Sequence, residues 1–77
     1  MNTVNEKEIP GYIQRMNSEL YELSERKDKL RKFIESEKSE NLSVEDKLDL
    51  LLQLNAMEEY AVVLKRRVNR AYKREGI

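Results

Sequence analysis

Hydrophobic residues in the first half of the chain recur at steps of three and four positions. This stripe consists of Ile9, Ile13, Met16, Leu20, Leu23, Leu30 and Ile34. Such spacing places apolar side chains on one narrow face of an α-helix, which then packs against another helix. Pro10 suits the first helical turn because its missing N–H would have no partner there. The pattern predicts a helix over residues 10–37, with Gly11 or Tyr12 as alternative first residues.

A second stripe with the same spacing runs through the second half of the chain. It consists of Leu50, Leu54, Met57, Ala61, Leu64, Val68 and Ala71. Ser43 suits the start of this helix because its hydroxyl can cap the first turn, where Glu45 and Asp46 complement the helix dipole. Gly76 suits a C-terminal cap. We predict a helix over residues 44–73, a polar loop over 38–43 and a flexible segment over 1–8.

Two helices joined by a short loop pack antiparallel. With Asn41 as the centre of the loop, Ile13 faces Val68, and Lys27 lies level with Asn55. A lone hairpin of this length encloses too small a core, and the second helix carries further apolar residues off its stripe. These residues are Leu48, Leu51, Leu52, Val62 and Val63. We therefore predict an all-α helical hairpin that assembles into a symmetric homo-oligomer.

The composition of the chain excludes several classes of function. The 77 residues include neither cysteine nor histidine, so thiolate metal sites and the commonest general base are missing. No glycine-rich phosphate loop or catalytic spacing occurs. No apolar run approaches the ~20 residues of a membrane span, and the N-terminus lacks the layout of a signal peptide. We expect a cytoplasmic protein that is not an enzyme and uses no metal or cofactor.

Basic residues are concentrated at the end of the second helix. They are Lys65, Arg66, Arg67, Arg70, Lys73 and Arg74. One interpretation is a solvated face, because cations interact favourably with the C-terminal end of a helix dipole. The other is an anion site, because arginine binds phosphate through two N–H groups, and Tyr12 and Tyr72 nearby can stack on a nucleobase. The formal net charge of zero argues against general nucleic-acid binding.

Lys27 interrupts the first stripe midway between Leu23 and Leu30. A lysine at such a position can extend its charge out to water, or it can set the register or oligomeric state of packed helices. A third possibility is that Lys27 projects into a pocket between protomers and contacts a negatively charged ligand. The sequence alone leaves these three interpretations open.

A set of these residues resembles a known family of phage proteins. The set is Ile9, Pro10, Gly11 and Tyr12, Lys27 fifteen residues later, and Leu64, Arg66 and Val68 in the second helix. It resembles the small phage anti-CBASS proteins that sequester cyclic oligonucleotides, whose helical hairpin also occurs in phage anti-Thoeris sponges that trap cyclic ADP-ribose species. The stretch over residues 55–60 is similar to small uncharacterised proteins of crAss-like phages.

The resemblance implies ligand pockets between the protomers of a hexamer. In such pockets a tyrosine stacks on a base and a lysine contacts phosphate, which would be the roles of Tyr12 and Lys27, with Gly11 beside them. Together with the basic run, the expected ligand-binding residues are Gly11, Tyr12, Lys27, Arg66, Arg67 and Arg70. Fifteen residues of helix span ~22 Å. One small ligand can therefore contact Tyr12 and Lys27 only when they belong to different chains.

The expected function is that of a phage-encoded, non-catalytic sponge in the host bacterial cytoplasm. It would sequester a cyclic oligonucleotide or a cyclic ADP-ribose type of immune signal, with no membrane partner. An alternative is a coiled-coil adaptor or inhibitor that binds another protein through the second apolar face. A third and weaker interpretation is a small nucleic-acid-binding phage protein.

Overall fold

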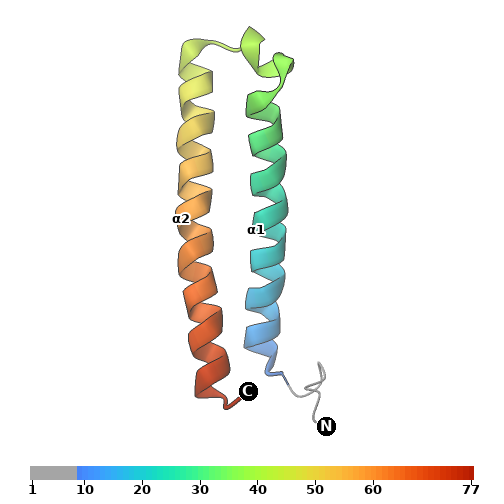
Figure 1. Ribbon diagram of the computed structural model, residues 1–77, viewed down its shortest axis with the longest axis vertical. Coiled ribbons are helices and arrows are strands. Elements are labelled where there is room, and N and C mark those ends of the chain that lie inside the picture. The colour runs from blue at the N-terminus through green and yellow to red at the C-terminus, as the bar shows by residue number, and fades with distance from the viewer. Residues whose placement is uncertain (1–8) are drawn as a thin grey trace.

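The computed structural model describes residues 9–77, which form a helical hairpin (Figure 1). Helix α1 (Gly11–Glu35) and helix α2 (Val44–Arg74) lie side by side and antiparallel, joined by the short 3₁₀ helix η2 (Glu37–Asn41). No strand occurs within residues 9–77. The two long helices predicted from the sequence are therefore confirmed. The segment over residues 1–8, which we expected to be flexible, lies outside the described residues.

The connection between the long helices differs from the predicted loop. Helix α1 ends at Glu35, and most of the polar stretch that follows forms η2. The buried hydroxyl of Ser39 donates to the carbonyl oxygens of Ile34 and Ser36, at 2.8 and 2.9 Å. These bonds hold η2 against the end of α1. The stretch is polar because its serines satisfy backbone carbonyls, and it is not an open loop.

Both ends of α2 carry the caps that the sequence predicts. The Ser43 hydroxyl accepts a hydrogen bond from the backbone N–H of Asp46 at 3.0 Å. At the other end Gly76 has a φ of 74°, a left-handed conformation that glycine adopts at little cost. The Gly76 N–H donates to the carbonyl of Lys73, and the Ile77 N–H donates to that of Tyr72. This pair of bonds is a Schellman motif, which ends α2 cleanly after Arg74.

The buried core of the hairpin lies at the end opposite η2. Its cluster comprises Ile13, Met16, Leu64, Val68 and Ala71. Ile9, Tyr12, Leu20 and Tyr72 pack against it and are half-buried. Toward η2 the stripe residues of both helices are only half-buried; these are Leu30, Ile34, Leu50, Leu54 and Met57. The hairpin is therefore best packed beside the first turns of α1 and the last turns of α2.

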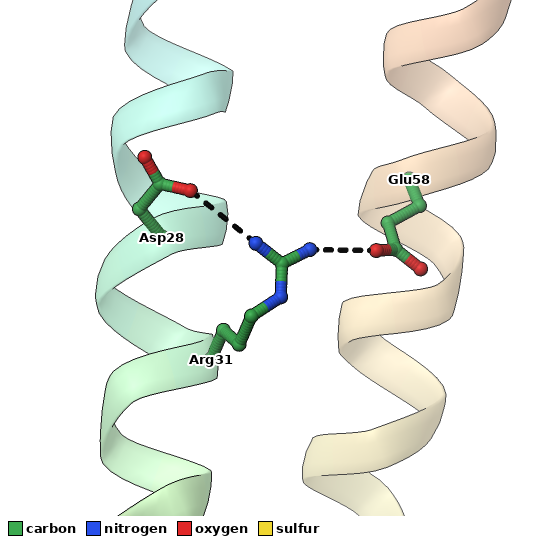
Figure 2. A network of polar contacts seen from close by, with 3 residues as sticks. All are labelled: Asp28, Arg31 and Glu58. Atoms are coloured by element: carbon green, nitrogen blue, oxygen red, sulfur yellow. Dashed lines mark hydrogen bonds and ion pairs between the residues drawn. The ribbon is translucent and has the colours of Figure 1, made fainter.

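The polar contact between the two long helices joins residues that do not lie level with each other in the backbone register. Arg31 donates to a carboxylate oxygen of Glu58 at 2.8 Å and also lies 3.4 Å from Asp28 (Figure 2). A register centred on Asn41 would instead place Leu51 level with Arg31. Long side chains lean toward the N-terminus of their own helix, and in an antiparallel pair the two leans add. The contact is half-exposed and adds little to stability.

Candidate functional site

Aromatic and basic side chains from both long helices meet at the end of the hairpin opposite η2. Tyr12 comes from the first turn of α1, and Arg67, Arg70 and Arg74 come from the last turns of α2. Residues spaced by three and four positions share one face of a helix, so the three arginines point the same way. With Met16 they line a surface hollow of about 240 Å³, which we call the arginine hollow.

Tyr12 is fixed in place by its ring and by its hydroxyl group. The ring packs against the buried core cluster. The hydroxyl donates to a carboxylate oxygen of Glu75 at 2.7 Å and accepts from a guanidinium nitrogen of Arg74 at 3.3 Å. The guanidinium carbon of Arg74 also lies 5.8 Å from the ring centroid, which is within range of a cation–π interaction. These contacts place one aromatic ring at the edge of the hollow.

Arg67 and Arg70 have no protein partner among residues 9–77. Both side chains are exposed, and neither forms a hydrogen bond or ion pair with a residue of that range. Each guanidinium group carries five N–H donors in a fixed planar arrangement that matches the oxygens of phosphate or carboxylate. An anion that enters the arginine hollow would therefore find donors without breaking a contact within this part of the chain.

Tyr72, the second aromatic residue expected to stack on a base, does not line the hollow. It is half-buried against the core cluster, and its hydroxyl accepts a hydrogen bond from the side-chain amide of Asn17 at 2.9 Å. Its position on α2 turns it toward α1 instead of toward the arginines. Tyr72 therefore belongs to the packing beneath the site, and Tyr12 is the aromatic residue that lines the hollow.

The remaining predicted ligand residues lie away from the hollow in a single protomer. Arg66 is exposed on α2 but is not part of the lining. Gly11 lines a separate, larger and more open hollow with Arg15, and a Cβ added at Gly11 would lie 3.3 Å from a guanidinium nitrogen of that arginine. Lys27 is half-buried on α1, fifteen residues from Tyr12, and forms no hydrogen bond or ion pair within residues 9–77.

The structure thus brings together three of the six predicted residues, namely Tyr12, Arg67 and Arg70, and adds two that the prediction missed. Arg74 has the spacing of the other two arginines, but the predicted helix ended one residue before it. Met16 follows Tyr12 by four positions and was assigned to the stripe alone. Both signals were present in the sequence.

Within residues 9–77, no group of three or more acidic side chains is placed to hold a metal ion. Neither α1 nor α2 contains a stretch that is apolar enough and long enough to span a membrane.

The fold and the hollow define a small helical-hairpin protein with a basic and aromatic surface site. A family model described as Sequestin matches residues 10–70, which include most of both long helices. The chain therefore belongs to the Sequestin family. Tyr12, Arg67 and Arg70 lie inside the matched range, and Arg74 lies beyond it. The family name suggests that a molecule is bound and held, which agrees with the resemblance to phage sponges. No curated protein sequence and no solved structure matches the chain.

Proposed function

We propose that this protein is a phage-encoded sponge that sequesters a nucleotide-derived immune signal in the cytoplasm of the host bacterium. The signal would be a cyclic oligonucleotide or a molecule of the cyclic ADP-ribose type. One observation carries the proposal. The fixed ring of Tyr12 borders a hollow lined by three arginines, and two of them, Arg67 and Arg70, have no partner within residues 9–77.

The chemistry of the hollow fits a ligand that combines phosphate with a base. Arg67 and Arg70 supply charged N–H donors to phosphate oxygens, and such charge-assisted hydrogen bonds are about twice as strong as neutral ones. A base that stacks on Tyr12 replaces the guanidinium group of Arg74, which is then free to contact the phosphate. The carboxylate of Glu75 accepts the hydrogen bond of the Tyr12 hydroxyl, which holds the edge of the ring in place.

The size of the hollow supports a site that is shared between protomers. Its volume of about 240 Å³ is smaller than the ~300–1,000 Å³ typical of pockets that bury a whole small ligand. One hollow therefore accommodates part of a cyclic nucleotide, and a neighbouring protomer covers the rest. In that arrangement Lys27 contributes from a second chain, as the resemblance to the hexameric sponges implies, and Gly11 and Arg66 remain predicted ligand residues.

A binding role without turnover suits the chemistry of this chain. The sequence contains no histidine and no cysteine, so it lacks the side chains that most often act as general base or nucleophile near neutral pH. A sponge needs affinity and many copies, and both are compatible with a chain of 77 residues.

Thermal melting with a panel of candidate ligands tests the proposal. The panel contains cyclic dinucleotides, cyclic trinucleotides and cyclic ADP-ribose isomers. A ligand present at a hundred times its dissociation constant stabilises the folded state by ~2.7 kcal/mol, which raises the melting temperature by several degrees. We expect one class to produce this shift in the wild type, and Arg70→Glu to remove it. The matched control Lys29→Glu reverses an exposed charge on α1, away from the hollow, and should keep the shift.

The second candidate function is that of an adaptor or inhibitor that binds another protein. It is favoured by the exposed apolar residues of α2, which include Leu48, Leu52 and Val62. If no ligand of the panel changes the melting temperature, the adaptor becomes the better interpretation.

A further inference from the structure

A second hollow lies where η2 joins the two long helices, at the other end of the hairpin from the arginine hollow (Figure 1). Its volume is about 250 Å³, and we call it the η2 hollow. Leu51 of α2 is one of its lining residues, and ~24 Å of helix separates Leu51 from Arg67 of the arginine hollow. One small ligand therefore does not reach both hollows. The lining comes from α1, η2 and α2, and consists of Ile34, Ser39, Lys47, Leu50 and Leu51.

The walls of the η2 hollow are mainly aliphatic. Ile34 and Leu50 are half-buried, and Leu51 keeps 52% of its accessible surface. The buried hydroxyl of Ser39 has one hydrogen, which it directs to the carbonyl oxygens of Ile34 and Ser36. The hydroxyl thus has no hydrogen to donate to a ligand. An aliphatic group that enters the hollow would remove partly hydrated apolar surface from water, which is favourable.

Of the residues that the structure describes, Lys47 is the one charged side chain that lines the η2 hollow. It is exposed and forms no hydrogen bond or ion pair with another residue of the range 9–77. An ammonium group carries three N–H donors on a flexible stem, so it can meet a carboxylate at the edge of the hollow. A ligand that fits this place has an apolar body and one anionic head.

The charges around this end of the hairpin limit how many negative charges such a ligand carries. Between residues 34 and 51 six acidic residues stand against two lysines, although none of the acids lines the hollow. The acids are Glu35, Glu37, Glu40, Glu45, Asp46 and Asp49. Repulsion grows with the charge of the ligand, so a doubly charged phosphate is disfavoured more than a carboxylate with one charge. The η2 hollow therefore differs in its ligand from the arginine hollow.

We propose that the η2 hollow binds a small aliphatic monocarboxylate. Its chain lies against Ile34, Leu50 and Leu51, and its carboxylate lies at the ammonium group of Lys47. Scaled from benzene, which fits a protein cavity of ~150 Å³, the hollow accommodates roughly ten carbon atoms. Medium-chain acids such as octanoate fill it, and longer chains project into water. No nucleotide takes part, so this inference goes beyond the proposed function and does not depend on it.

Titration of the isotope-labelled chain with octanoate, followed by NMR below the micelle-forming concentration, tests the location of the site. We expect the amide signals of Ser39, Leu50 and Leu51 to shift along one binding curve. The signals of Tyr12 and Arg70, at the other end, should stay in place. Affinity should rise about fourfold for each methylene group from hexanoate to decanoate, and level off at dodecanoate. Absent shifts, or shifts spread evenly over the exposed residues, would overturn the proposal.

Leu51→Asn tests the aliphatic wall, with Leu48→Asn as its matched control. Both leucines lie on α2 and are exposed, at 52% and 55% of their accessible surface, so neither change is expected to unfold the hairpin. Leu51 lines the hollow and Leu48 does not. We expect Leu51→Asn to weaken octanoate binding on the order of tenfold, and Leu48→Asn to change it by less than about twofold. An equal loss in both would mean that octanoate binds exposed apolar residues in general, and would overturn the assigned site.

Lys47→Glu tests the contact with the carboxylate. The wild type should bind octanoate about three- to fivefold more tightly than octylammonium, which is the range of a partly exposed ion pair. Lys47→Glu should reverse this preference. Lys38→Glu makes the same charge change at an exposed position of η2 that does not line the hollow, and it should keep the preference of the wild type. A wild type that binds octylammonium as tightly as octanoate would overturn the proposed class of ligand.

Discussion

Tyr12 contacts the buried core with its ring and two charged side chains with its hydroxyl. Because the core cluster holds the ring, the position of the aromatic face depends on packing and not on the surface hydrogen bonds. Those bonds are exposed and individually weak. Lys27, by contrast, is half-buried in the stripe of α1 without a hydrogen bond or ion pair within residues 9–77. Substitutions at these two positions separate the contribution of the site from that of the fold.

Replacing Tyr12 tests whether its ring or its hydroxyl matters for the ligand. Tyr12→Phe keeps the ring, so we expect unchanged ligand affinity within about twofold and a loss of less than about 1 kcal/mol in the free energy of unfolding. Tyr12→Ala removes the stacking surface, which is worth ~1–3 kcal/mol per base and so lowers affinity roughly tenfold or more. Isothermal titration calorimetry and urea unfolding provide the two measurements. Equal affinity in the alanine variant would show that Tyr12 is not a ligand residue.

Replacing Lys27 tests whether the interruption of the stripe is an imperfection or part of the site. Lys27→Leu puts an apolar side chain on a half-buried seam, so we expect the free energy of unfolding to rise by about 1 kcal/mol in urea titration. If Lys27 also contacts ligand phosphate across a protomer interface, the same variant binds more weakly although it is more stable. A fall in stability would mean instead that the ammonium group makes a favourable contact in the assembled protein.

Much of the candidate site could be predicted at the level of single residues. Arg67 and Arg70 follow from the helical spacing of the basic run, because the period alone places them on one face. Arg74 was missed because the predicted helix ended at Lys73, whereas α2 continues through Arg74 and so places this arginine on the same face as Arg67 and Arg70. The inward position of Tyr72 depends on how the two helices are rotated against each other, and the spacing of residues along one helix does not contain that information.

At the scale of elements, the two long helices could be predicted from their apolar stripes and caps. The 3₁₀ helix that connects them could not. Ser43 and Gly76 act as caps because the geometry they need is local and nearly independent of the rest of the chain. Helix η2 is held by the Ser39 hydroxyl, which donates to the carbonyl oxygen of Ile34 five residues earlier, and the pattern of apolar positions does not predict such a side-chain bond. A run of polar residues therefore looks like a loop in the sequence and forms a 3₁₀ helix in the structure.

Ser43→Ala tests the start of α2. The substitution leaves the Asp46 N–H without its acceptor, so we expect a loss of about 1 kcal/mol in the free energy of unfolding. Ser18→Ala is the matched control, because Ser18 is exposed within α1 and alanine favours helix. Urea titration of both variants at one protein concentration provides the comparison. A loss as large in the control would mean that the capping bond contributes nothing specific.

The hairpin is a rod of 54 × 19 × 18 Å in which α1 packs against α2 along its length and against η2 at its end. Such a shape encloses little, and only seven hydrophobic residues are buried within residues 9–77. Small domains with so few buried residues usually gain stability from association. The exposed apolar residues of α2 and the small volume of the arginine hollow both support the proposal that the ligand site is shared between chains.

Depletion and recovery of a signal molecule tests the proposed sequestration most directly. The protein is mixed with each cyclic nucleotide of the panel, the free nucleotide is measured after filtration, and the retained fraction is measured again after heat denaturation. We expect one class to disappear from the filtrate in proportion to added protein and to be released intact and in full on heating, with Tyr12→Ala retaining a smaller fraction at the same protein concentration. No depletion of any nucleotide, or release of a chemically altered product, would contradict a non-catalytic sponge.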